Sequence, residues 1–177
     1  LEAKLYGFNA LASRDARAPV PPEALSRSRL TTGPALTAVP DIPVGTGDWP
    51  TYRHDVGRSG VTAARAPSAL DISWRRALPR PLSSVVCVAD TVYVSAVDAH
   101  TVFALSRRTG EIRWQVTAAG RVDSPPTVVS GRVVFGSADG SVTCVRATDG
   151  QLCWRYQVAP ADRMLGAFGQ LESVWPV

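Results

Sequence analysis

The sequence contains few of the residues that usually carry chemistry. Its 177 residues include two histidines, three cysteines and one methionine. No run of about 18 apolar residues occurs, so the sequence contains no candidate membrane-spanning helix. The cysteines match no zinc-ligand spacing, and none adjoins another. The sequence therefore offers little material for a catalytic or metal site.

Lysine is also nearly absent, although the net charge is +4. Lys4 is the single lysine among nineteen basic residues, and the longest arginine runs are the pairs Arg75-Arg76 and Arg107-Arg108. A nucleic-acid-binding protein usually gathers its basic residues into a patch or stripe. We therefore expect solvated surface arginines and no nucleic-acid partner, with a polyanion-binding surface as the less favoured alternative.

The most informative feature that is present is a repeat marked by tryptophan. Trp74, Trp114 and Trp154 are evenly spaced along the chain. The segment TGEIRW, which ends at Trp114, matches DGQLCW, which ends at Trp154, and DISW ends at Trp74. A period of about 40 residues in a strand-rich chain indicates repeated small sheets, as in a β-propeller.

Each full repeat is expected to contain four short strands. Turns with glycine separate them: Gly110 and Gly150 are predicted to be left-handed turn residues, and Asp139-Gly140 predicts a two-residue hairpin. Most strand positions are apolar, which is typical of sheets covered on both faces. The expected strands are 84–89, 91–97, 101–106 and 111–118, then 124–129, 132–138, 141–146 and 151–158.

The predicted fold class is all-β. We expect an incomplete β-propeller with two complete four-stranded blades, parts of others and a long irregular N-terminal segment. Because residue 1 is leucine, the chain is expected to be a piece of a longer or processed protein. The expected divisions are 1–12 (end of a preceding module or blade), 13–47 (Pro-rich linker or loop), 48–70 (leading segment), 71–78 (ring-closing outer strand), 79–118 and 119–158 (blades) and 159–177 (truncated start of the next blade).

The repeat can be written apolar-x-x-x-[Thr/Asp]-Gly-x-apolar-x-Trp. Over residues 48–160 it resembles the repeat of the PQQ-like (pyrroloquinoline-quinone) propeller family. That family includes quinoprotein alcohol dehydrogenases and a propeller lipoprotein of bacterial outer-membrane assembly. We expect Gly110 and Gly150 to form turns, and Trp74, Trp114 and Trp154 to pack against the neighbouring blade.

The resemblance implies a cofactor only for the enzymes of the family. Their quinone is surrounded by a disulfide between adjacent cysteines, an acidic base and a calcium site, and no residue of this chain matches that set. We therefore expect no catalytic, cofactor-binding or metal-binding residues here, with quinone and calcium binding as the alternative. His54 and Asp55 are interpreted as structural, because no convergent partner is visible.

Cys144 and Cys153 flank the turn at 147–150. If Arg146 pairs with Gln151, the two cysteines face each other across the ladder, within reach of a disulfide. This possible disulfide would indicate an oxidising compartment. We accordingly expect a periplasmic or extracellular protein.

The sequence favours a non-catalytic platform for protein partners. The alternatives are part of a quinoprotein dehydrogenase, or the accessory propeller of a multidomain enzyme whose catalytic domain lies outside this chain.

Overall fold

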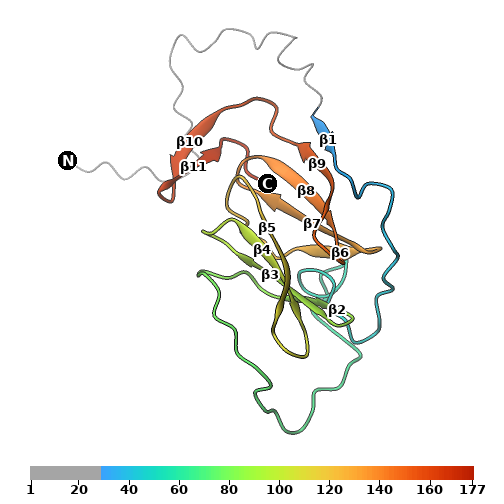
Figure 1. Ribbon diagram of the computed structural model, residues 1–177. Helices are drawn as coiled ribbons and strands as arrows, with labels where there is room; N and C mark the ends of the chain where they lie inside the picture. Colours follow the sequence, from blue (N-terminus) through green and yellow to red (C-terminus); the bar gives the residue numbers. More distant parts are fainter. Residues whose placement is uncertain (1–28) are drawn as a thin grey trace, which may run out of the picture.

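The computed structural model describes residues 29–177, in which eleven strands form three antiparallel sheets (Figure 1). The first sheet contains, in spatial order, β2 (Val86–Val88), β3 (Thr91–Ala96), β4 (Thr101–Ser106) and β5 (Ile112–Thr117). The second contains β6 (Thr127–Val129), β7 (Arg132–Ser137), β8 (Ser141–Arg146), β9 (Leu152–Gln157) and β1 (Leu30–Thr32). The third is the hairpin of β10 (Met164–Ala167) and β11 (Gln170–Ser173).

All eight strands predicted for the two repeats are confirmed. Several are shorter than predicted, most clearly β6, which begins late, at Thr127. Pro125 and Pro126 explain the delay, because proline has no N–H to donate to a ladder. No helix among residues 29–177 is long and apolar enough to cross a membrane.

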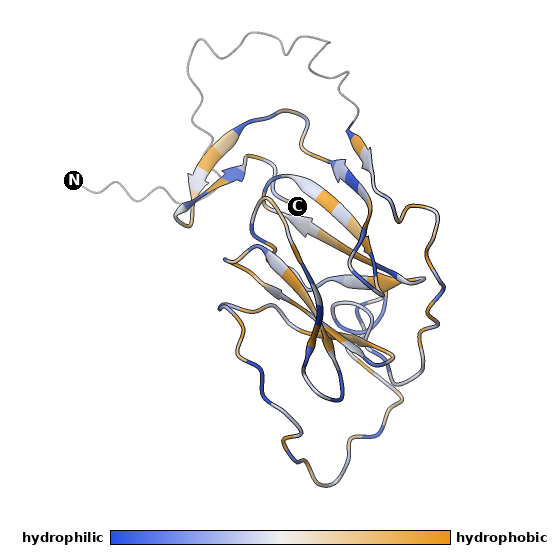
Figure 2. Ribbon diagram, in the orientation of Figure 1, coloured by the Kyte–Doolittle hydropathy of each residue, from blue (hydrophilic) through white to orange (hydrophobic). Residues whose placement is uncertain are grey.

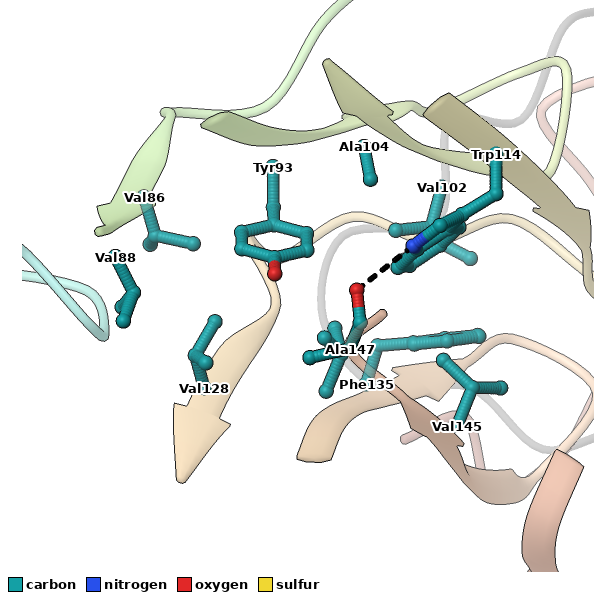
Figure 3. Close-up of a cluster of buried hydrophobic side chains, with 12 residues drawn as sticks. Val86, Val88, Tyr93, Val102, Ala104, Trp114, Val128, Phe135, Val145 and Ala147 are labelled. Carbon is teal, nitrogen blue, oxygen red and sulfur yellow. Dashed lines mark hydrogen bonds between the residues drawn. The ribbon is translucent and has the colours of Figure 1, made fainter. Parts of the chain in front are cut away.

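The main core lies between the two repeated sheets (Figure 3). Tyr93 and Trp114 of the first sheet contact each other with ring centroids 5.8 Å apart, and Phe135 and Val145 of the second sheet belong to the same cluster. Val122, from the connection between the sheets, is fully buried there. Figure 2 shows hydrophobic residues distributed along the strands of both sheets. The sheets are therefore joined by their facing apolar sides.

One irregularity occurs at the same place in both repeats. The ladder between β4 and β5 shifts register between Ala104 and Leu105, and the ladder between β8 and β9 shifts between Cys144 and Val145. Each shift is a β-bulge, in which one strand contributes an extra residue and its twist increases. The predicted register was wrong for this reason: Cys144 pairs with Trp154, and Cys153 is the extra residue.

A second correction concerns the turn between β7 and β8. It has three residues rather than two, because Ser137 pairs with Ser141. The carboxylate of Asp139 accepts hydrogen bonds from both serine hydroxyls and from the Ser141 N–H, and Gly140 follows with φ of 81°. A local side-chain network thus selects the longer turn.

The predicted linker 13–47 is partly ordered into a strand. Leu30, Thr31 and Thr32 form β1, which pairs with the outer edge of β9. Pairing follows because the edge of a sheet presents unsatisfied N–H and C=O groups. The predicted module 1–12 and the first part of the linker, up to residue 28, lie outside the described residues.

Residues 71–78 do not form the predicted outer strand. A ladder needs a partner strand, and none of the residues in 29–177 pairs with this segment. It still contacts the first sheet: Leu78 packs on the cluster that contains Val94 and Phe103, on the face opposite the main core. Its role as a ring-closing strand stays a prediction.

The leading segment runs beside the innermost strands of both sheets. Trp49 exchanges two backbone hydrogen bonds with Cys87 of β2, and the Pro50 carbonyl accepts one from Val128 of β6. The buried carboxylate of Asp48 accepts a hydrogen bond of 3.0 Å from the Ala89 N–H. This segment therefore fixes β2 and β6 relative to each other.

Candidate functional site

The repeated tryptophans make a repeated contact. The indole N–H of Trp74 donates to the carbonyl of Arg107 at 2.8 Å, and that of Trp114 donates to the carbonyl of Ala147 at 2.9 Å. The sequence separation between donor and acceptor is the same in both cases. Trp114 therefore links the first sheet to the turn that precedes β9 in the second sheet.

The turn glycines receive the indole rings. A Cβ atom at Gly110 would lie 2.5 Å from Trp74, and one at Gly150 would lie 2.9 Å from Trp114. Both glycines also have left-handed φ angles, 70° and 73°, as the turn pattern predicts. Glycine is needed here for two reasons: the backbone conformation and the close approach of the ring.

Trp154 departs from this pattern. It is partly buried and packs against the cluster of Ala35, Cys144 and Cys153. Nothing in residues 29–177 accepts a hydrogen bond from its indole N–H, and the equivalent acceptor position of the next repeat lies beyond residue 177. The structure thus shows two of the three expected tryptophans against a following turn.

We predict that Gly150→Ala destabilises the protein more than Gly169→Ala. Gly169 has a similar φ of 76° but no atom within 4 Å of a Cβ, so its substitution isolates the conformational cost of about 1–2 kcal/mol. Gly150→Ala should cost about 1–3 kcal/mol more, because the Trp114 ring must move. Chemical denaturation of both variants measures the difference, and equal losses would contradict the contact.

The β10–β11 hairpin forms a second, unforeseen feature. Arg121, from the loop between the sheets, pairs with the buried carboxylate of Glu172 and lies over the Phe168 ring, 4.0 Å from its centroid. The hydrogen bond to Glu172 raises the pKa of Arg121. Gln170 bonds His100 in the β3–β4 turn. The hairpin is thereby fixed to the ends of the sheets while Phe168 and Leu171 stay exposed.

The cysteine pair is buried. Cys144 and Cys153 are free thiols with no exposed surface, and they pack together with Ala35. Burial, followed by the neighbouring Cys153, raises the pKa of Cys144 to about 12. Although the predicted register was wrong, the bulge still places the two side chains in one cluster. The disulfide stays a prediction.

We predict one reactive thiol, Cys87, when protein made in an oxidising compartment is denatured without reductant, and three after reduction. In the native reduced protein Cys87 should react fastest, because it is only partly buried whereas the other two thiols are fully buried. Titration with a chromophoric disulfide reagent measures both results. Three thiols without reductant would exclude the Cys144–Cys153 disulfide.

His54 and Asp55 lie together but do not form a nucleophile–base pair. The Asp55 carboxylate accepts hydrogen bonds from the hydroxyl and the N–H of Ser59, and these lower the pKa of Asp55 to about 2. The His54 Nδ1 lies 3.4 Å from the same carboxylate. Ser59 thus donates to the carboxylate of Asp55 rather than to His54. These three residues close a turn at the surface.

Solved structures define the class of this fold. The chain is similar to the quinohemoprotein alcohol dehydrogenase of Comamonas testosteroni, with a TM-score of 0.54 and 21% identity, over 82% of this chain and 24% of that one. It is also similar to the quinohemoprotein alcohol dehydrogenase ADHIIG of Pseudomonas putida HK5, with a TM-score of 0.51 and 18% identity, over 64% of this chain and 19% of that one. The two repeated sheets are therefore blades of an incomplete β-propeller.

The family is narrower than that class. The family model described as outer membrane protein assembly factor BamB matches residues 59–175, more than half of the chain, and this chain belongs to that family. It is 31% identical over 82 residues to the BamB of Moranella endobia (strain PCIT), a match that covers 46% of this chain. The chain spans about a fifth of the length of that relative, since the match covers 21% of it.

Proposed function

We propose that this chain is a non-catalytic part of a β-propeller that acts as a platform for protein partners. The membership in the BamB family carries this proposal. The contacts support it: Trp114 and the leading segment join the two blades into one rigid unit, while the turns and the β10–β11 hairpin remain at the surface. A rigid scaffold that presents exposed turns is suited to binding other proteins.

The name of the relative suggests the process. An outer membrane protein assembly factor acts on proteins destined for the outer membrane, so we propose partners of that assembly process and a periplasmic location. The exposed Phe168 and Leu171, with 78% and 69% of their surface accessible, supply apolar contact area of the kind found at the centre of protein interfaces.

Redox catalysis finds no support among the described residues. Residues 29–177 contain no group of three or more histidine, cysteine or acidic side chains that could hold a metal ion. The chain also has no adjacent cysteines. The residues present do not fit a quinone–calcium site, and the likeness to the dehydrogenases extends to the fold alone. We therefore propose that this part of the protein uses no cofactor.

We predict that the full-length protein restores outer-membrane protein levels in a bacterial strain that lacks its own BamB, because it would supply the same platform. Quantitative mass spectrometry of isolated outer membranes measures the levels, with an empty vector as the control. In a parallel assay, the purified protein with pyrroloquinoline quinone and calcium should not oxidise alcohols with a dye acceptor. Sustained turnover there, without restoration in cells, would overturn the proposal in favour of a dehydrogenase.

A further inference from the structure

The two blades are alike in sequence and in strand order, but their outer edges differ. In the second blade, β1 covers the outer edge of β9 (Figure 1). In the first blade, β5 is the last strand of its sheet. The same position of the repeat is thus covered in one blade and open in the other.

The covered edge shows how a segment binds there. The Gln157 N–H donates to the carbonyl of Arg29 at 2.8 Å, and the Gly33 N–H donates to the carbonyl of Cys153 at 2.8 Å. Thr31 lies between them, opposite Arg155. Because an antiparallel ladder alternates, the backbones of residues 153, 155 and 157 all face outward, toward β1.

The corresponding residues of β5, one repeat earlier, are Arg113, Gln115 and Thr117. The Ala118 N–H donates to the carbonyl of His100. Because the backbone groups of successive residues alternate in direction, the N–H and C=O groups of Gln115 and Thr117 point away from β4. All three residues are exposed. No backbone group in residues 29–177 pairs with this side of β5. A row of unsatisfied donors and acceptors is therefore open to solvent.

The usual protections of an edge strand are weak in β5. It contains no proline and no lysine. Its bulge gives no protection, because β9 has the same bulge and still pairs with β1. Its one charged side chain, Arg113, is held across the sheet by Asp90 at 2.6 Å and Thr91 at 2.7 Å.

We propose that the outer edge of β5 binds an extended segment of a protein partner, which adds to the blade as a fifth strand in the way that β1 adds to β9. This inference rests on the proposed function as a platform, and it names the site and the form of the partner. Backbone hydrogen bonds supply the binding, as in other cases of strand addition.

The same comparison defines the segment. Gly33 follows β1 because a Cβ atom there would lie 2.1 Å from the Leu152 carbonyl. In the first blade the residue equivalent to Leu152 is Ile112, the first residue of β5. Its carbonyl would exclude a side chain at the same position of a bound segment. A fitting segment therefore has about three residues of high β-propensity, as in Leu30–Thr32, followed by glycine.

The test uses the full-length protein and a synthetic peptide with the sequence of residues 29–36, RLTTGPAL. We expect the peptide to slow amide hydrogen exchange at Gln115 and Thr117. Gln115→Pro removes an outward N–H without removing a bond to β4, so it should weaken peptide binding at least about tenfold. Gln115→Ala, which keeps the N–H, should stay within about twofold.

A second pair of probes leaves the protein unchanged. N-methylation of the peptide at Thr31 removes a donor that faces the edge and should abolish the protection. N-methylation at Thr32, whose N–H points away, should leave it intact. The two methylated peptides therefore test whether the peptide binds the edge of β5 even if the Gln115→Pro variant does not fold.

Four results would overturn the proposal. Protection confined to β9 would show that the peptide merely displaces β1. Equal binding by Gln115→Pro and Gln115→Ala would place the peptide elsewhere. Dimerisation without peptide, lost in Gln115→Pro, would make a second copy of the chain the occupant. Restoration of outer-membrane proteins by Gln115→Pro at the normal level would leave the platform function standing while the edge site fails.

Discussion

The fold depends on an indole ring that lies against a glycine turn of the next repeat. The Trp114 ring occupies the space that a side chain at Gly150 would need, and its N–H satisfies a carbonyl that the same turn exposes. One residue thereby fills a gap, removes a large apolar surface from water and pairs a buried polar group. The constant spacing of the tryptophans is a consequence, because both partners must recur together for blades to join in series.

Sequence reasoning found the parts of the structure that are local. The eight strands of the two repeats follow from apolar runs and turn residues within a few positions of each strand. The left-handed conformations of Gly110 and Gly150 follow in the same way. Even the error at the Asp139 turn was one of loop length, since hydroxyls of flanking serines selected three residues instead of two.

What sequence reasoning missed depends on contacts between distant segments. The strand β1 exists because the edge of β9, which comes far later in the chain, offers it a ladder. The hairpin of β10 and β11 is fixed by Arg121 and His100, which no local pattern connects with Glu172 or Gln170. The bulge recurs at the same position of each repeat, one residue before the tryptophan. It could be predicted from the sequence only if the tryptophans were already known to face the adjacent turn.

Function in a repeat protein resides where one repeat differs from the next, because shared residues are already used to join the blades. The tryptophans and the turn glycines are common to the repeats, and they pack against each other to join one repeat to the next. The differences here are Cys153 in place of Arg113, β1 over one edge only, and the hairpin over one end of the two sheets. The exposed Arg113 has the buried Cys153 as its counterpart, and the other two differences change which edges and turns are exposed, while the joint between the blades stays intact. Under the proposed platform function, a chain with few residues suited to catalysis would distinguish its partners through the backbone edges and apolar turns that only some of its blades expose.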